Sequence, residues 1–443
     1  MLARPFLQPT NVRIADHNHR SEDKMKRGIV LFTVFAGFFL LALPLGFGQS
    51  ANPALRPHLM IHHPTNHNGM TAGTVHAAIA NAGTGALPVF FYGVQSSRDG
   101  NFYSGAIVGN IPFNHGGGTV SVPTQIIPLI LHTHTLGVSI SFHHGNFRAN
   151  GKITTAPGDA TFDPTAADNA CLGASNNVPT ELFQQSPLFQ SANFAFGPTA
   201  VGDTQYIDAF QRGSFWGVIN RSTYHTTLGP VQILDPIVVN VPADQGLAVV
   251  PSVFGTCGNF GIVNINLIDQ IARDSFASLA SAGVNPGSFP IYMLYNAAMS
   301  IGDPTDIFNC CAGGYHNAAA TSSTTIQTYS PLDFDATGVF GTGGLDTAIA
   351  SHEVGEWAND PYTNNPTPAW GHTGQVAGCQ NNLEVGDPLT GSLVPLVTMP
   401  NGFTYHLQEL AFFSWFYGMP SIAVNGWFSD NNTFTGDAGP PCQ

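Results

Sequence analysis

The chain has 443 residues, of which 43% are hydrophobic and only 9% are charged. Acidic residues outnumber basic residues by 27 to 13, which gives a formal net charge of −14 at pH 7. The apolar fraction excludes an intrinsically disordered chain, and the negative charge argues against binding to nucleic acid or to an anionic membrane surface. The length is typical of two or three packed units.

The N-terminal segment has the order of a secretory signal. A basic stretch ending at Arg27 precedes the uncharged apolar run Gly28–Leu43, and small residues follow before Gln49. The run is shorter than the about 20 residues that a membrane-spanning helix needs. We therefore predict a signal peptide over residues 1–48, with Met25 as an alternative start. The protein is then secreted to the extracellular space or the periplasm, without stable membrane insertion after cleavage. An uncleaved membrane anchor is the competing interpretation.

The predicted mature chain is strongly acidic and holds all six cysteines. Six of the 13 basic and three of the 27 acidic residues precede residue 49, so seven basic and 24 acidic residues remain, a net charge of −17. In an exported protein an even number of cysteines favours disulfides over a thiolate metal site. We expect the adjacent Cys310 and Cys311 to pair with two separate partners.

Residues 49–155 are predicted to form a β-rich N-terminal domain. Short runs of β-branched and aromatic residues alternate there with clusters of Gly, Asn and Pro. The strands are expected at Leu87–Tyr92, Gly105–Ile111, Thr119–Val122 and Gln125–His132. Residues 156–235 are predicted to be an irregular connecting region with one short helix around Gln205–Trp216.

Residues 236–443 have a different pattern, in which helices and strands alternate. Apolar residues at helical spacing predict a helix over Asn264–Ala282, which Gly283 ends. Further strands are expected at Ile237–Val241, Leu247–Val253 and Phe289–Tyr295, and further helices at Leu345–Ala358 and Tyr405–Tyr417. The predicted fold class is therefore α+β, with a β-rich N-terminal half followed by a part in which helices and strands alternate.

The stretch Ser351–Pro361, read SHEVGEWANDP, concentrates titratable side chains in a chain that is poor in charge. His352 and Glu356 are four residues apart, so a helix places them on one face. Zinc takes imidazole nitrogen and carboxylate oxygen as ligands, and a catalytic zinc keeps a position open for water. We therefore predict that His352 and Glu356 bind a metal ion, and that Glu353 takes a proton from metal-bound water.

A second acidic motif, Leu383–Asp387, follows at a distance where zinc hydrolases often place a third ligand. We predict that Glu384 is that ligand. Asp387 is predicted to accept the other ring N–H of His352 and so to orient the imidazole.

Two residues compete with Glu384 as the third ligand. Asp360 continues the spacing of the helix, although it precedes Pro361, where the helix is expected to end. His372 is the other candidate. Zn²⁺ is the predicted ion, while a site with two carboxylates also suits Mn²⁺ or Ca²⁺. His316 and His406 would stabilise an oxyanion if the fold brought them to the metal.

The order Ser-His-Glu-x-x-Glu, Asp-Pro, Trp and Glu-Val-Gly-Asp resembles the EXORDIUM / phosphate-induced protein 1 family and related uncharacterised secreted bacterial proteins. The resemblance covers roughly residues 310–390 and includes Gly314–His316 upstream. It implies that the β-rich N-terminal half is followed, over residues 236–443, by a zincin-like α+β domain built around a metal helix. The motif positions are His352, Glu353, Glu356, Glu384 and Asp387. The plant members are associated with cell expansion and wall signalling, and no established reaction comes with the family.

Two functions are compatible with these residues. The first is a secreted metal-dependent hydrolase that resembles zinc metallopeptidases and acts on a peptide, a cell-wall polymer or another extracellular substrate. The second is a non-catalytic binding, signalling or cell-surface protein that retains a structural metal helix. Three protein ligands beside a cleft would favour the first, and four or more ligands without a cleft would favour the second.

Overall fold

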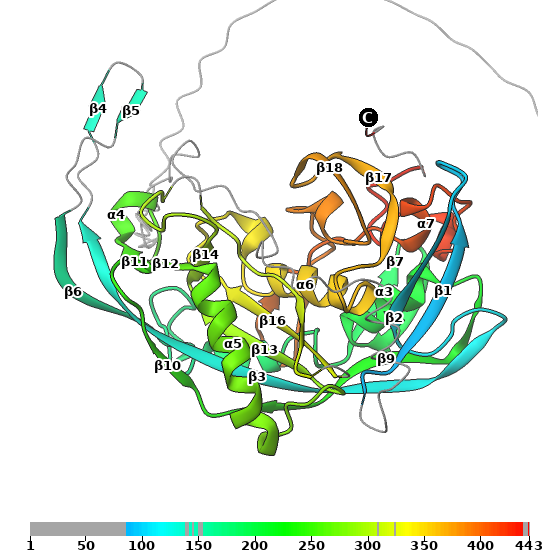
Figure 1. Cartoon of the computed structure of the whole chain (residues 1–443), viewed down its shortest axis with the longest axis horizontal. Coiled ribbons are helices and arrows are strands. Elements are labelled where there is room, and N and C mark those ends of the chain that lie inside the picture. Colours follow the sequence, from blue (N-terminus) through cyan, green and yellow to red (C-terminus); the bar gives the residue numbers. More distant parts are fainter. Residues whose placement is uncertain are drawn as a thin grey trace, which may run out of the picture. The chain divides into compact units, whose positions relative to one another are not determined.

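The computed structural model describes residues 86–137, 141–143, 146–148, 154–307, 310–322, 325–436 and 442 (Figure 1). The predicted signal peptide lies outside these residues. The part of the chain from Gln49 to Gln443 forms one compact unit. Among the described residues, no helix has both the length and the apolar character needed to cross a membrane.

A ten-stranded mixed sheet runs through this unit. Its strands are β3 (Gly116–Gly137), β6 (Thr154–Phe162), β9 (Ile219–Ile233), β10 (Ile237–Asn240), β11 (Gly246–Val249), β12 (Phe260–Asn264), β13 (Phe289–Tyr295), β14 (Ala297–Ser300), β15 (Asn317–Ala320) and β16 (Ile326–Phe334). The main order is β14-β12-β11-β3-β13-β16-β15, and β6, β9 and β10 also pair with β3.

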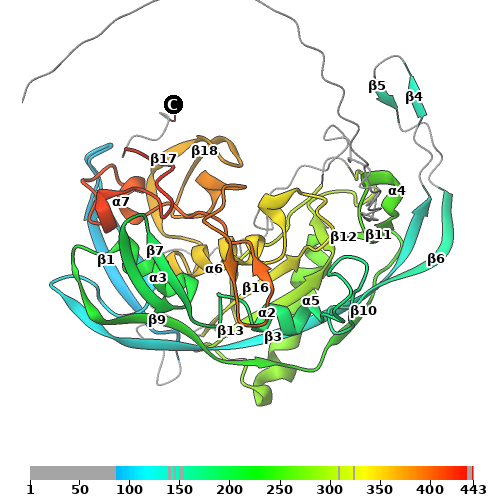
Figure 2. The ribbon, with the colours of Figure 1, turned by 180° about the vertical axis from the view of Figure 1, so that it is seen from behind.

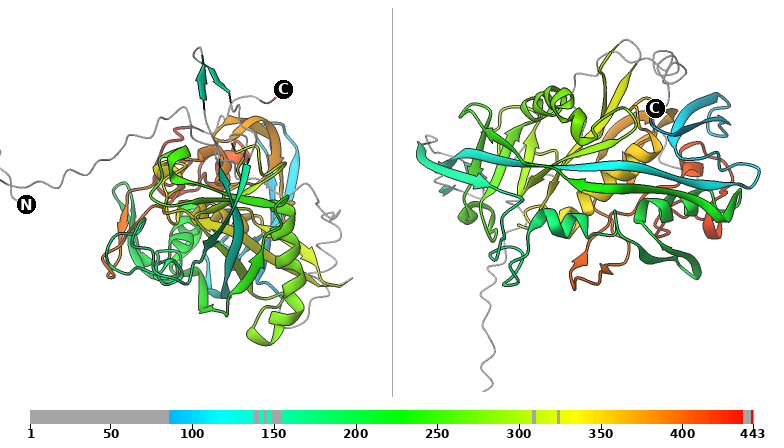
Figure 3. Two further views of the ribbon diagram at one scale, coloured as in Figure 1. Left: turned by 90° about the vertical axis from the view of Figure 1, so that its left-hand side faces the viewer. Right: turned by 90° about the horizontal axis from the view of Figure 1, so that it is seen from below.

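The long strand β3 joins the parts of the chain that the sequence separates. It pairs in parallel with β9, β10, β11 and β13, and Figure 3 shows β3 and β9 side by side. The three predicted segments 49–155, 156–235 and 236–443 therefore share one sheet. The two short strands predicted around Pro123 are one strand, because a register shift between Val122 and Thr124 accommodates the proline.

Among the described residues, five antiparallel hairpins form two-stranded sheets of their own. They are β1 (Val89–Gln95) with β2 (Phe102–Val108), β4 (Ser141–His143) with β5 (Asn146–Arg148), β7 (Ala192–Phe196) with β8 (Thr199–Thr204), β17 (Pro366–Thr373) with β18 (Val376–Asn382), and β19 (Val397–Thr398) with β20 (Thr404–Tyr405). Strand β18 leads directly into the Leu383–Asp387 motif.

Helices cover both faces of the sheet (Figure 1, Figure 2). In the described part of the chain the α-helices are α2 (Pro179–Gln184), α3 (Tyr206–Ser214), α4 (Pro251–Phe254), α5 (Ile265–Leu279), α6 (Ala348–Asn359) and α7 (Phe413–Phe416). Ile126 of β3 shares a core with α6, whereas Ile127 shares a core with α5. Because successive strand residues point to opposite faces, α5 and α6 lie on opposite sides of the sheet.

The predicted α+β class is confirmed, with more strand than helix. The predicted helix over Asn264–Ala282 is α5, and the side chain of Asn264 caps it by accepting the N–H of Asn266. The predicted helix over Leu345–Ala358 is α6. The predicted strand Phe289–Tyr295 is β13, whose seven residues are all buried.

The prediction of a helix over Tyr405–Tyr417 is wrong. Only Phe413–Phe416 is helical. The backbone before it bonds outward to distant segments: the N–H of Ala411 reaches the carbonyl of Val385 and the N–H of Phe412 reaches that of Phe428. These contacts keep the segment extended, although its apolar pattern alone favours a helix.

The six cysteines form three disulfides, Cys171–Cys257, Cys310–Cys311 and Cys379–Cys442. Disulfide bonding as such was expected. The prediction that Cys310 and Cys311 take separate partners is wrong, because the four other cysteines pair among themselves.

Candidate metal centre

Helix α6 is held rigidly on the sheet. The indole of Trp357 stacks on Phe289 of β13, with ring centroids 3.8 Å apart and an interplanar angle of 13°. Its Nε1 donates to Thr328 Oγ1 at 3.0 Å. The helix ends at Asn359, because Pro361 disfavours helical geometry at the residue before it, Asp360. All twelve residues of α6 are buried, so its side chains have fixed surroundings.

The ring of His352 has a defined orientation. Its Nδ1 lies 3.0 Å from Gln408 Oε1, and Gln408 Nε2 donates to the carbonyl of Gly386 at 2.8 Å. The amide oxygen of Gln408 is therefore the acceptor and Nδ1 carries the proton. His352 Nε2 lies 3.1 Å from Glu356 Oε1 and 3.4 Å from Asp387 Oδ1. Among the described residues this buried nitrogen makes no hydrogen bond.

The carboxylate of Glu356 lies between two histidines. Its Oε1 accepts the backbone N–H groups of Gly386 and Asp387, each at 3.1 Å, and faces His352. Its Oε2 lies 3.7 Å from Nδ1 of His316. A Cβ at Gly386 would lie 2.5 Å from His352 Nδ1, so the glycine permits this close approach.

His316, which precedes β15, is the second histidine. Its Nε2 lies 3.1 Å from the carbonyl oxygen of Asp360, which can only accept a hydrogen bond. Nδ1 is thereby directed at carboxylates, with Glu353 Oε2 at 3.4 Å and Glu356 Oε2 at 3.7 Å. Glu384 Oε2 lies 3.8 Å from Nε2.

Two overlapping groups of three residues have the arrangement of cation ligands. The first group is His352, Glu353 and Glu356, and the second is His316, Glu356 and Glu384. In each group, one potential ligand atom of every residue lies within 4.8 Å of those of the other two. Glu356 belongs to both groups. All five side chains are at most 2% exposed. Ligands bound about 2.0–2.2 Å from a tetrahedral zinc lie about 3.3–3.6 Å apart, close to the separations around His352 Nε2.

Electrostatics favour a positive charge at this position. Burial opposes the charged form of His352, but the carboxylates of Glu356 and Asp387 outweigh it and raise the pKa of the imidazole well above its ordinary value of 6.5. Burial is also the main reason that the pKa of Glu356 rises to about 7. The pair therefore retains a proton at neutral pH unless a metal ion takes its place.

The predicted site residues are brought together, but in a different grouping. Glu384 lies beside His316, whereas Asp387 faces the same nitrogen of His352 as Glu356 does. Gln408, and not Asp387, accepts the other ring N–H of His352. The Gly314–His316 segment was a sequence signal for His316. Gln408 carried no signal, since it lies in a segment predicted to be helical.

Asp360, a competing candidate for the third ligand, and His406, a candidate for stabilising an oxyanion, have other partners. The carboxylate of Asp360 accepts backbone N–H groups of the loop that follows α6, at 2.9–3.0 Å. His406 Nδ1 lies 2.6 Å from Asp346 Oδ2, and the Asp346 hydrogen bond raises the pKa of that imidazole. Neither belongs to the two buried groups.

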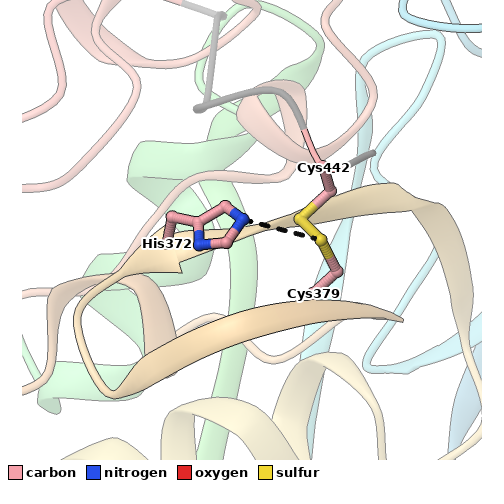
Figure 4. Close-up of side chains that lie close together, drawn as sticks. All are labelled: His372, Cys379 and Cys442. Carbon is pink, nitrogen blue, oxygen red and sulfur yellow. Dashed lines mark hydrogen bonds between the residues drawn. A yellow bond between two sulfur atoms is a disulfide. The ribbon is translucent and has the colours of Figure 1, made fainter.

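His372 lies beside a disulfide. It is exposed on β17, and its Nε2 is 3.9 Å from Sγ of Cys379, which is bonded to Cys442 (Figure 4). A disulfide sulfur lacks the negative charge of the thiolate that binds metals. His372, Cys379 and Cys442 therefore do not form a metal site in the oxidised protein.

Comparison of the chain with protein family models, with curated proteins and with solved structures found no match. The resemblance to the EXORDIUM family stays a prediction from the residues that suggested it. What the centre can do is inferred from its own geometry and chemistry.

Proposed function

We propose that this protein is a secreted metal-dependent hydrolase whose ion lies against Glu356, with Zn²⁺ as the first choice and Mn²⁺ or Ca²⁺ as alternatives. His352 and Glu356 are ligands of this ion. The Leu383–Asp387 motif supplies the remaining ligands, from Glu384 on the His316 side of Glu356 and from Asp387 on the His352 side. The observation that supports this most strongly is the buried His352 Nε2, which Gln408 turns toward two carboxylates and which makes no hydrogen bond among the described residues.

The adjacent Glu353 provides a base. A bound divalent ion lowers the pKa of its water toward neutrality. Glu353 follows His352 on α6, and its Oε2 lies 3.4 Å from His316 Nδ1. The carboxylate belongs to the same group as His352 and Glu356, so it can accept a proton from water on an ion held there. Because Glu356 takes the place that a second histidine has in HExxH enzymes, the water is less acidic than in those sites.

The predicted extracellular location suggests the class of substrate. Three disulfides suit an extracellular protein. A peptide or a cell-wall polymer is the kind of substrate that such a hydrolase meets. The resemblance to the EXORDIUM family supports the metal helix and supplies no reaction.

A structural metal in a non-catalytic binding or signalling protein is the second candidate, and burial is the observation that favours it. The five grouped side chains are at most 2% exposed. Two cavities, of about 680 and 240 Å³, are lined by residues of other parts of the chain, such as Trp427 in the larger and Asn259 in the smaller. Neither is lined by a residue of the two groups.

Metal analysis together with a hydrolysis assay tests the proposal. Wild type is compared with Glu353→Gln, Glu356→Ala and the exposed control His372→Ala, with casein and peptide libraries as substrates. We expect Glu353→Gln to keep the ion and to lose hydrolysis, and Glu356→Ala to lose both. Metal without hydrolysis in wild type would favour the structural alternative, and a protein without stoichiometric metal would exclude both.

A further inference from the structure

We propose that the centre binds two divalent cations, bridged by the carboxylate of Glu356. This inference rests on the proposed metal site and extends it from one ion to two. One ion lies between His352 Nε2, Glu356 Oε1 and Asp387 Oδ1. The other lies between His316, Glu356 Oε2 and Glu384.

First, the two oxygens of Glu356 face different histidines. Oε1 faces His352 at 3.1 Å, and Oε2 faces His316 at 3.7 Å. The backbone N–H groups of Gly386 and Asp387 hold the carboxylate in this position. A carboxylate that presents one oxygen to each of two imidazoles has the geometry of a bridging ligand. Ions in two-metal hydrolytic sites lie about 3.5–4 Å apart, which one carboxylate can span.

Second, each of the two histidines has its own orienting acceptor. Gln408 Oε1 accepts from His352 Nδ1, and the carbonyl of Asp360 accepts from His316 Nε2. Metal-bound histidines usually donate their other ring N–H in this way. The orientation of each ring is therefore fixed by a separate hydrogen bond, and each ring directs its other nitrogen at Glu356.

Third, the centre concentrates negatively charged side chains. Four carboxylates meet at the centre, those of Glu353, Glu356, Glu384 and Asp387, and none is more than 7% exposed. When all four are ionised, they carry four negative charges, which equals the charge of two divalent ions. Buried charge without a counterion is costly. Two divalent ions balance the four carboxylates.

The ligand set indicates which ions fit. It combines imidazole nitrogen with a majority of carboxylate oxygens, which suits Mn²⁺ and Zn²⁺ and offers no thiolate for softer ions. Mn²⁺ is the useful probe because it is paramagnetic, so two ions on one bridge give an exchange-coupled spectrum that a single ion cannot give.

The test is the stoichiometry of Mn²⁺. Metal-free full-length protein is loaded with Mn²⁺, freed of excess ion by gel filtration, and measured by elemental analysis and electron paramagnetic resonance. We expect two ions per chain with an exchange-coupled spectrum. His316→Ala should retain one ion with the spectrum of an isolated Mn²⁺, and the exposed control His372→Ala should retain two.

The possible failures are distinguishable. One ion per wild-type chain with an uncoupled spectrum would overturn the two-ion inference and leave the proposed metal-dependent function in place. No bound ion would overturn both. The number of ions bound by the wild-type chain decides between one ion and two, so this test still holds if His316→Ala does not fold. Glu384→Gln is a milder variant, and we expect it to lose one ion as well.

Discussion

His352 donates its Nδ1 proton to the side-chain oxygen of Gln408, a residue 56 positions further along the chain, at 3.0 Å. This bond decides which nitrogen of the imidazole faces Glu356. Gln408 is itself held by its bond to the carbonyl of Gly386, next to Asp387. One amide side chain therefore couples the metal helix to the second acidic motif.

Replacing Gln408 should weaken metal binding more than it weakens folding. In Gln408→Ala the ring of His352 loses its orienting acceptor, and the loss of such a partner typically costs about 10–100-fold in metal affinity. Competition with a fluorescent chelator measures the dissociation constant, and circular dichroism checks the fold. The exposed Gln190→Ala serves as the matched control. A folded Gln408→Ala protein with wild-type affinity would contradict the assigned role.

Gly386 should tolerate no side chain. A methyl group there would lie 2.5 Å from His352 Nδ1, so Gly386→Ala must displace either the ring or the acidic motif. We expect a loss of at least about 10-fold in metal affinity and about 1–3 kcal/mol in stability. Gly378→Ala is the control, because a Cβ at that position meets nothing within 4 Å. Equal behaviour of the two variants in chelator competition and urea unfolding would rule out the steric explanation.

Trp357 should be a main source of stability for α6. Trp357→Ala removes the stack on Phe289 and the hydrogen bond to Thr328, and truncation of a buried tryptophan costs about 3–5 kcal/mol. Trp357→Phe keeps a ring and should cost less. Urea unfolding followed by circular dichroism gives both values. A cost below about 1 kcal/mol for the alanine variant would show that the helix is anchored elsewhere.

The pair of His406 and Asp346 should make stability depend on pH. The hydrogen bond that the His406 imidazole donates to the Asp346 carboxylate raises the pKa of His406 above its ordinary value of 6.5 on folding. The stabilisation is then complete below about pH 6.5 and is lost as the pH rises through the folded-state pKa. His406→Ala should cost about 1 kcal/mol at pH 5.5, given the partial exposure of the pair, and less at pH 9. A difference between wild type and variant in urea unfolding that is constant over this range would refute the assignment.

The sequence was sufficient to predict the helices and strands that local residue patterns specify. The helix predicted over Leu345–Ala358 is α6 (Ala348–Asn359), and it ends before Pro361 as expected. The continuous apolar run Phe289–Tyr295 was sufficient for β13, because a strand buried on both faces needs no alternation.

The sequence was insufficient where distant segments decide the structure. The 405–417 segment has the apolar density of a helix, yet its backbone bonds to Val385 and Phe428 keep it extended. That extended path is what brings Gln408 to His352. The parallel pairing of β3 with four later strands likewise depends on contacts that no local pattern contains.

Crystals of the full-length protein soaked with Zn²⁺ or Mn²⁺ and measured at the absorption edge of the metal test the central claim most directly. The proposed centre requires an anomalous peak about 2.0–2.2 Å from His352 Nε2 and from an oxygen of Glu356. No peak there, with His352 Nε2 hydrogen-bonded directly to Glu356 in place of an ion, would contradict the claim.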